Sequence, residues 1–181
     1  RLDDVAARAG VSKGTLYLYF DSKDALFRAV IQEGVVPSLE AGEAMLAEAT
    51  GSARELLRCM LSGWWQMVGA TRFGGIPKLM ISEATNFPEV AQFYNDAVIE
   101  RGRALLREVL RRGIASGEFR PVNIELAIST IFAPLLMLAI WRHSMVVCGC
   151  AAEDPDSYLD THLDLVLNGL AVQAAPSDSA P

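Results

Sequence analysis

The stretch GVSKGTLYLYFDSKDAL, residues 10–26, gathers polar and aromatic side chains near the start of an otherwise apolar chain. Apolar residues recur at helical spacing just before it, in residues 2–9, and Gly10 then supplies the left-handed turn that commonly ends a helix. Ser12 is a typical N-cap residue, so a second short helix is expected over residues 13–19. Two short helices joined through Gly10 predict a helix-turn-helix.

The predicted second helix divides its side chains between two faces. Leu16 and Phe20, one helical turn apart, are expected to face inward and to anchor the helix. The remaining polar, small and aromatic residues are left on or near the outer face: Lys13, Gly14, Thr15, Tyr17 and Tyr19. Lysine suits phosphate or guanine, glycine permits close approach, and threonine and tyrosine offer hydroxyls and apolar contacts to thymine. This face favours DNA binding. The alternative is an ordinary helical corner in which the glycine, the caps and the tyrosines serve only packing.

The rest of the chain repeats helical spacing and shows no convincing strand alternation, so an all-α fold is expected. Further helices are expected over residues 22–49 with a bend near Pro37, 53–70, 76–84, 88–115, 123–147 and 156–173. Residues 72–75 are expected to be a flexible loop, and the small, polar tail 174–181 to be disordered. The predicted domains are a DNA-binding head over residues 1–30 and a larger domain over residues 31–173.

Composition and motifs exclude several classes of function. Apolar residues make up 51 % of the 181-residue chain and charged residues 21 %, which indicates a globular protein. The chain has two histidines and no Gly-x-Ser-x-Gly motif, so an enzyme is not expected. Cys148-Gly149-Cys150 near His143 raises a metal-site hypothesis. Its spacing is tighter than in structural zinc sites and a fourth ligand is missing, so no metal and no cofactor are expected.

The cysteines and the apolar runs predict the location of the protein. Three cysteines, together with no export signal in the given sequence, predict reduced thiols and a cytoplasmic protein. The uncharged run 126–141 contains Pro134 and is shorter than the roughly 20 residues that span a bilayer. We therefore expect this run to form a helix that is buried on nearly all sides, and we expect no membrane partner.

The run VAARAGVSKGTLYLYFDSKDALFRAV, residues 5–30, closely resembles the helix-turn-helix signature of TetR-family transcriptional repressors. The sequence Gly117-Glu118-Phe119-Arg120 also looks like that family's connection into its last two helices. The resemblance implies that residues 12–19 form the recognition helix and its cap. It implies that Lys13, Gly14, Thr15 and Tyr17 lie nearest the bases, and that Tyr17, Tyr19 and Lys23 approach phosphates.

Some positions depart from the family pattern. Arg1 stands where the family often has serine or threonine, and an arginine there could still hold a phosphate. Leu18 stands where polar or aromatic residues are common, so it is expected to be exposed and to touch little. The family's first helix and its preceding arm are not in the sequence, so we expect a fragment that lacks its true N-terminus. In such a fragment the first helix would not cover the apolar side chains of Val5, Leu16 and Phe20.

The resemblance further implies a ligand cavity in the middle helices and a dimer made by the last two helices. The candidate effector-binding residues are Trp64, Trp65, Met67, Met80, Glu83, Phe93 and Tyr94. The candidate dimer-interface residues are Ile131, Leu135, Leu138, Leu159, Leu163, Val166 and Leu170. The alternative for both sets is that they form internal core, and for the dimer set both can hold, because a helix as apolar as residues 124–147 must be covered on most sides.

The predicted function is a DNA-binding transcriptional regulator. The most specific form of this prediction is a homodimeric repressor that binds a near-palindromic operator in double-stranded DNA. A small, largely apolar or aromatic effector would release it from the DNA. One alternative is a helical dimerisation or adaptor module without DNA binding. Another is a ligand-independent regulator or an activator.

Overall fold

The computed structural model describes residues 2–145 and 154–172, and these residues confirm the all-α fold. In the described part of the chain, the only β-type pairing is one isolated antiparallel bridge between Phe119 and Ala171. The α-helices are α1 (Leu2–Ala9), α2 (Lys13–Tyr19), α3 (Lys23–Gly34), α4 (Val36–Glu48), α5 (Ala53–Trp64), α6 (Ile76–Glu83), α7 (Pro88–Tyr94), α8 (Glu100–Ala115), α9 (Ile124–Ser144) and α10 (Pro155–Leu170).

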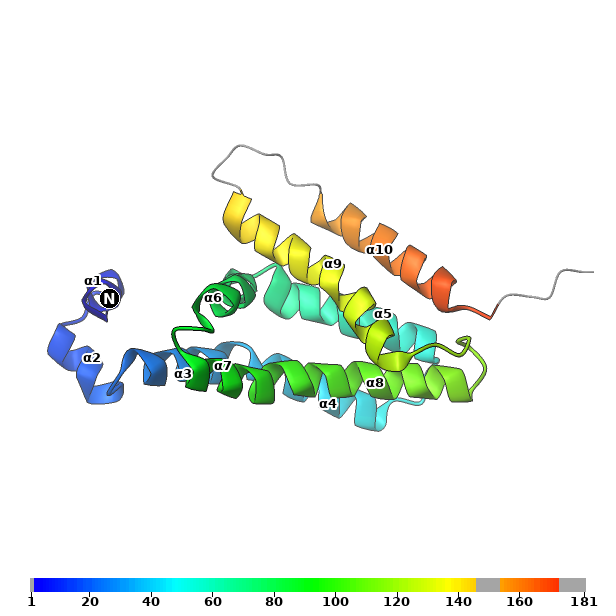
Figure 1. The fold of residues 1–181 in the computed structure, drawn as a ribbon, viewed down its shortest axis with the longest axis horizontal. Helices are drawn as coiled ribbons and strands as arrows, with labels where there is room; N and C mark the ends of the chain where they lie inside the picture. Colours follow the sequence, from blue (N-terminus) through cyan, green and yellow to red (C-terminus); the bar gives the residue numbers. More distant parts are fainter. Residues whose placement is uncertain (1, 146–153, 173–181) are drawn as a thin grey trace, which may run out of the picture.

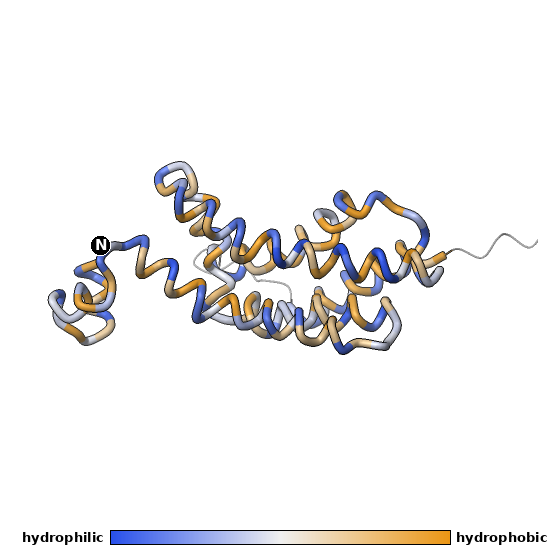
Figure 2. The backbone as a smooth tube through the Cα atoms, turned by 90° about the horizontal axis from the view of Figure 1, so that it is seen from below, coloured by the Kyte–Doolittle hydropathy of each residue, from blue (hydrophilic) through white to orange (hydrophobic). Residues whose placement is uncertain are grey.

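The helices form a small head and a larger body. Helices α1 and α2 make the head at one end of the molecule, and α3 leads from the head to the body, which is α4 to α10 (Figure 1). The view turned by 90° shows the same separation (Figure 2). Within the body, α8 packs against α4, α5 and α9, and α10 packs against α9 and α5. Helix α3 runs through the expected domain boundary at residue 30, so head and body share one continuous helix.

The turn between α1 and α2 follows the sequence prediction. Gly10 has a φ of 70°, in the left-handed region that glycine adopts without steric cost. The Val11 amide donates to the carbonyl oxygen of Ala6 at 3.1 Å. Ala6 is buried at 2 % exposure, and its small side chain lets the two helices approach closely. Ser12 caps α2 by accepting a hydrogen bond from the amide of Thr15 at 3.0 Å.

The segment that was expected to bend near Pro37 is instead two separate helices. Helix α3 ends at Gly34 and α4 begins at Val36, with Val35 between them. Pro37 lies in the first turn of α4, where its missing N–H is not needed. In a continuous helix, its ring would clash with the carbonyl four residues earlier, so the chain starts a new helix.

Residues 72–75 were expected to be a flexible loop, and this expectation is wrong. They form a short 3-10 helix, Arg72–Gly75, capped by Thr71, whose hydroxyl oxygen accepts from the Phe73 amide at 3.2 Å. Gly74 is buried, and a Cβ there would overlap the carbonyl oxygen of Gly69 and approach Nε2 of His143 at 2.8 Å. Gly74 therefore permits a close approach between this turn and its neighbours.

The connection Gly117–Arg120 joins three helices. Gly117 has a φ of 77° and ends α8, and Phe119 is buried at 2 % exposure against Gly113. The Glu118 carboxylate accepts from the amides of Ala53 at 3.0 Å and Arg54 at 3.2 Å, which caps α5 and lowers the pKa of Glu118. The Arg120 amide donates to the carbonyl of Leu170 at 2.8 Å, which ties the connection to α10.

Helix α9 is less covered than the sequence predicted. By length and composition alone it would suffice to cross a membrane, yet only 28 % of its apolar window is buried inside the protein. One face packs into the core, whereas Leu126, Met137 and Trp141 remain 66 %, 56 % and 41 % exposed. The expectation of burial on nearly all sides is therefore wrong, and one apolar face of α9 is left at the surface.

The candidate dimer residues lie inside the body, so their assignment to a dimer surface needs correction. Six of them are between 0 % and 8 % exposed: Ile131, Leu135, Leu138, Leu159, Leu163 and Leu170. Val166 is partly buried against the same core. These side chains form the contact between α9, α10 and the rest of one chain. They are the internal core, which was the alternative that the sequence left open.

Candidate functional site

Helix α2 presents an open face to solvent. Thr15 is exposed, and Tyr17, Leu18 and Tyr19 are 43 %, 83 % and 77 % exposed, whereas Leu16 is 7 % exposed and anchors the helix. A Cβ at Gly14 would meet only the Ser12 hydroxyl at 3.7 Å, so the surface above Gly14 is open. The inward and outward sides of α2 therefore match the sequence prediction.

Three of the candidate DNA-binding side chains, Ser12, Lys13 and Thr15, already have partners. The Ser12 hydroxyl accepts from the Thr15 amide and lies 2.7 Å from the Thr15 hydroxyl, so Ser12 acts as a cap. The Lys13 ammonium lies 2.9 Å from a carboxylate oxygen of Asp3 on α1. Hydrogen bonding and charge from Asp3 raise the pKa of Lys13, so this lysine is fully charged at neutral pH. The pair is exposed, and a phosphate can compete for the ammonium.

Two of the candidate phosphate contacts, Lys23 and Arg1, lie outside α2. Lys23 begins α3, and its ammonium lies 4.9 Å from the centre of the Phe87 ring, just before α7. Arg1 lies outside the described residues. Lys23 therefore belongs to the contact between α3 and the body as well as to the surface of the head.

The body contains a cavity of about 670 Å³. Helices α4 to α9 all contribute to its wall, and nearly all the lining side chains are apolar. Four of the candidate effector-binding residues line it: Trp64, Met67, Met80 and Tyr94. Burial raises the pKa of Tyr94 to about 12, so its phenol stays neutral and retains its O–H donor. The size and lining suit a small apolar ligand.

The other three candidates lie elsewhere, which corrects their assignment. Trp65 is buried at 3 % exposure in the core formed with α9 and α10. Glu83 lies at the end of α6, where its carboxylate accepts from the Asn86 side-chain amide at 3.3 Å. Phe93 packs under Arg28 of α3. The helix changes to a π-helical turn at Trp65–Gly69, and of the two adjacent tryptophans only Trp64 lines the cavity.

Sequence reasoning missed most of the cavity wall. Helix α4 contributes Ser38, Ala41, Gly42 and Met45, whose helical spacing places them along one face and was a usable signal. Helix α9 contributes Phe132, whose ring lies edge-on to Trp64 at 4.7 Å between centroids. Helix α8 contributes Gly102 and Arg103. The contribution of α9 has no signal in the sequence, because apolar residues are spread around that helix without forming one distinct stripe.

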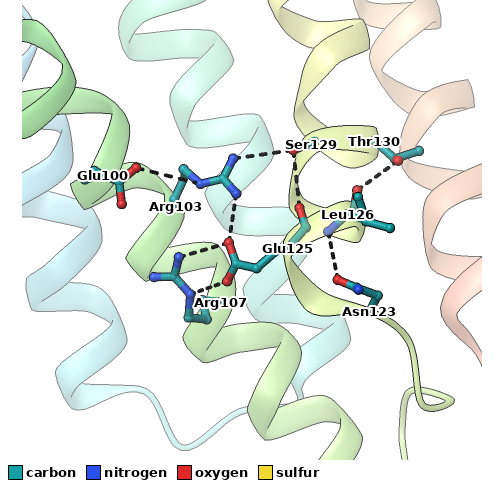
Figure 3. Close-up of polar contacts among 8 residues, drawn as sticks. All are labelled: Glu100, Arg103, Arg107, Asn123, Glu125, Leu126, Ser129 and Thr130. Carbon is teal, nitrogen blue, oxygen red and sulfur yellow. Dashed lines mark hydrogen bonds and ion pairs between the residues drawn. The ribbon is translucent and has the colours of Figure 1, made fainter.

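A charged network joins α8 to α9 at the edge of the cavity (Figure 3). Glu125 of α9 accepts from Arg107 Nε at 2.5 Å, from Arg107 Nη2 at 3.1 Å and from Arg103 Nη2 at 2.8 Å. These hydrogen bonds lower the pKa of Glu125 to about 2. Arg103 also donates to the hydroxyl of Ser129 at 3.4 Å, and both of these residues line the cavity.

Helix α7 lies between the cavity and α3. Its residues Ala91 and Tyr94 line the cavity. On its other side, the Arg28 guanidinium lies 4.7 Å from the centre of the Phe93 ring, and Arg28 Nη2 donates to the carbonyl of Glu89 at 3.1 Å. Helix α7 therefore connects the wall of the cavity directly to the helix that carries the head.

The cysteine pair of the metal-site hypothesis, Cys148 and Cys150, lies outside the described residues. His143, the third group in that hypothesis, is exposed and packs beside Gly74 and Gly75. His162 is buried, and its Nε2 lies 2.8 Å from the carbonyl oxygen of Ile131. Both histidines thus have contacts within the body.

Comparison with protein families gives two matches. Residues 1–30 match the family described as bacterial regulatory proteins, tetR family, and residues 47–153 match the tetracyclin repressor-like C-terminal domain. Among curated proteins of Bacillus subtilis (strain 168), a fatty acid metabolism regulator protein is 26 % identical over 136 residues, 75 % of this chain and 69 % of that protein. The uncharacterized HTH-type transcriptional regulator YdeS is 27 % identical over 175 residues, 96 % of this chain and 79 % of that protein.

Solved structures show the same fold. The TetR-family regulator PfmR from Thermus thermophilus superimposes with a TM-score of 0.73 at 25 % identity, over 95 % of this chain and 90 % of that chain. FadR from Bacillus subtilis, solved in complex with stearoyl-CoA, gives a TM-score of 0.69 at 21 % identity, over 94 % of this chain and 88 % of that chain. These matches, together with the exposed α2 face and the cavity, identify a DNA-binding transcriptional regulator rather than an enzyme. The chain belongs to the TetR family of bacterial regulatory proteins.

Proposed function

We propose that this protein is a cytoplasmic homodimeric repressor that binds a near-palindromic operator and is released by an effector with a long apolar chain. On the DNA, Lys13, Gly14, Thr15 and Tyr17 would face the bases of the major groove, and Tyr19 and Lys23 would contact phosphates. The exposure of these side chains on α2 and at the start of α3 supports this assignment. Ser12 would act indirectly, by fixing the first turn of α2.

The effector class is inferred from the cavity and from the relatives. Helices α4 to α9 all line the cavity, and its surface is largely apolar, with methionine, leucine, valine, isoleucine, alanine and aromatic side chains. One relative is named as a regulator of fatty acid metabolism, and a structural neighbour was solved with stearoyl-CoA. We infer an acyl-type effector, whose burial in the cavity would be driven by the hydrophobic effect.

Helix α7 is the proposed route from the effector to the head. It lines the cavity through Tyr94 and holds α3 through Arg28 and Phe93. A ligand that displaces α7 therefore changes the position of α3 and of the head beyond it. The shift in operator affinity is limited to the difference in the ligand's affinity for the two conformations. The shared use of α7 by the cavity and α3 is the observation that carries the proposal.

The dimer surface is proposed to be the outer face of α9 and α10. Exposed residues on α9 recur at helical spacing: Leu126, Thr130, Met137 and Trp141. Helix α10 adds Leu165, which is 67 % exposed. A largely apolar surface of this kind is typical of a protein interface. A second copy on this face would place two α2 helices on one side of the DNA, about 34–36 Å apart on successive major grooves.

The experiment begins by selecting genomic fragments that the full-length protein binds. Transcription from a bound promoter is then measured in vitro with the protein alone and with the protein plus palmitoyl-CoA. The proposal predicts that the protein lowers transcription and that palmitoyl-CoA restores it. Stimulation of transcription would instead identify an activator, and repression that no acyl ligand relieves would identify a ligand-independent regulator.

A further inference from the structure

We infer that Arg103 forms an anion-binding subsite in the wall of the cavity, so that the effector is an apolar chain that ends in an anionic head group. This inference rests on the acyl-effector function proposed above and specifies which end group is recognised. Among the described residues that line the cavity, Arg103 is the only one with a charged side chain. The Ser129 hydroxyl lines the cavity beside it (Figure 3).

Arg103 has hydrogen-bonding capacity to spare. A guanidinium carries five N–H donors, and Arg103 directs Nη2 to Glu125 at 2.8 Å. Its Nη1 contact to Ser129 is long, at 3.4 Å, and its Nε lies 4.0 Å from Glu100, beyond hydrogen-bond distance. The side chain is 29 % exposed, so an incoming anion would keep part of its hydration.

Glu125 does not depend on Arg103 for its charge partner. Arg107 alone holds both carboxylate oxygens of Glu125, through Nε at 2.5 Å and Nη2 at 3.1 Å. Two guanidinium groups therefore face Glu125 at this point of the α8–α9 contact, and the Glu100 carboxylate lies 4.0 Å from Arg103 Nε. If Arg103 turns to a ligand, Glu125 keeps a two-bond partner in Arg107, and the exposed Glu100 carboxylate gives up only a 4.0 Å contact and stays hydrated.

The neighbouring lining explains why the ligand would be amphipathic. Leu106 and Phe132, close to Arg103 and Ser129 along their helices, also line the cavity. An alkyl chain would lie against these groups while carboxylate or phosphate oxygens accept hydrogen bonds from the guanidinium. Charge-assisted bonds of this kind are roughly twice as strong as neutral ones. The anion could be the carboxylate of a free fatty acid or a phosphate of a coenzyme A thioester, which share this chemistry.

The test compares three ligands with the same alkyl chain: palmitate, palmitoyl-CoA and hexadecanol. Their affinities for the full-length protein are measured by calorimetry for the wild type, Arg103→Gln, Glu125→Gln and Arg111→Gln. Arg111 is an exposed arginine of α8 that pairs with Glu108 and serves as the matched control. We expect wild type and Arg111→Gln to prefer at least one of the anionic ligands over hexadecanol by about tenfold or more.

The two network variants should act in opposite directions. Arg103→Gln should remove the preference for the anionic ligand and leave hexadecanol binding unchanged. Glu125→Gln should strengthen binding of the anionic ligand, because Arg103 loses its competing partner. A purely structural network would instead lower all affinities in both variants. If Arg103→Gln loses the preference for palmitate over hexadecanol, the subsite binds a carboxylate. If it loses only the preference for palmitoyl-CoA over hexadecanol, the subsite binds a phosphate.

Two results would overturn the inference, and they are distinguishable from each other. If hexadecanol binds the wild type as tightly as the anionic ligands do, or if Arg103→Gln keeps the preference, then Arg103 does not recognise the head group, although an acyl effector still stands. If none of the three ligands binds, the acyl-effector proposal itself fails, and the inference fails with it.

Discussion

The guanidinium of Arg28 lies 4.7 Å from the centre of the Phe93 ring, and this stacking joins the helix that carries the head to a helix that lines the cavity. Arg28 also donates to the Glu89 carbonyl, so one side chain makes both an aromatic and a backbone contact with α7. Phe93 thus contacts α3 and is not part of the cavity wall. A movement of α7 would reach the DNA-binding face through Arg28.

Replacing the Arg28 guanidinium should uncouple the two sites. Arg28→Met keeps an apolar side chain but removes the stacking and the hydrogen bond to Glu89. We expect effector affinity to change little, whereas the coupling between effector and operator should fall by about 0.5–2 kcal/mol. Operator affinity with and without effector measures this coupling. Arg58→Met, at an exposed position of α5, is the control, and equal coupling in both variants would refute the role of Arg28.

The pairing of Lys13 with Asp3 should weaken DNA binding. Asp3→Asn removes a carboxylate next to the proposed DNA face and frees the Lys13 ammonium, so operator affinity should rise severalfold. Lys13→Gln should lower the affinity and reduce the slope of log affinity against log salt by about 1. Leu18→Ala, at a residue 83 % exposed, should have little effect. Fluorescence anisotropy at several salt concentrations tests all three. A fall in affinity with Asp3→Asn would contradict the account.

A charge on the outer face of α10 should disrupt the dimer. Leu165→Glu places a carboxylate in the proposed interface, where its desolvation would be costly. Sedimentation equilibrium should show a shift from dimer to monomer at micromolar concentration. Leu79→Glu on α6, at a residue 43 % exposed, should remain dimeric. If both variants remain dimers, the interface lies elsewhere on the body.

Two substitutions at Gly63 should have different effects on effector affinity and on the free energy of unfolding. Gly63 lines the cavity, and a Cβ built on it has nothing within 4 Å. Gly63→Ala should stabilise α5 by about 0.5–1 kcal/mol and leave effector binding nearly unchanged. Gly63→Leu should remain folded but occupy ligand space, so effector affinity should fall. Urea unfolding and calorimetry test the pair, and unchanged effector affinity in Gly63→Leu would exclude this cavity as the binding site.

The connection Gly117–Arg120 should contribute strongly to stability. Phe119 is almost fully buried between α8 and the other helices of the core. Phe119→Ala should lower the free energy of unfolding by about 3–5 kcal/mol, because it leaves a cavity that the rigid helices cannot fill. Urea denaturation gives the value directly. A loss below about 1 kcal/mol would mean that the surrounding helices collapse into the space.

The features that could be predicted best from the sequence are those that depend on neighbouring residues in the chain. Gly10 and Ser12 act through their own backbone and cap geometry, so the helix-turn-helix and the outward face of α2 could be predicted from adjacent residues. The residues of the dimer surface could not. Apolar residues are spread around α9, so its pattern does not reveal which stripe packs internally. Leu135 and Met137 are both large apolar residues in the same uncharged run, yet Leu135 is 0 % exposed and Met137 is 56 % exposed.

The cavity wall depends on how distant helices dock. Arg103 appears in the sequence as one of several arginines on α8, which is typical of a solvated helix face. Only the position of α9 places it next to Ser129 and a cavity. Phe93 and Trp65 were predicted to bind a ligand because of their residue type, but helix packing turns them toward α3 and the core.

The most direct test of the account is the operator affinity of the full-length protein with and without a saturating acyl ligand. The measurement uses fluorescence anisotropy on a selected operator, with palmitoyl-CoA as the ligand and calorimetry to establish that it is bound. We predict that the bound ligand weakens operator affinity by about tenfold or more, equivalent to about 1.4 kcal/mol of coupling. An unchanged operator affinity with the ligand demonstrably bound would contradict the proposed switch.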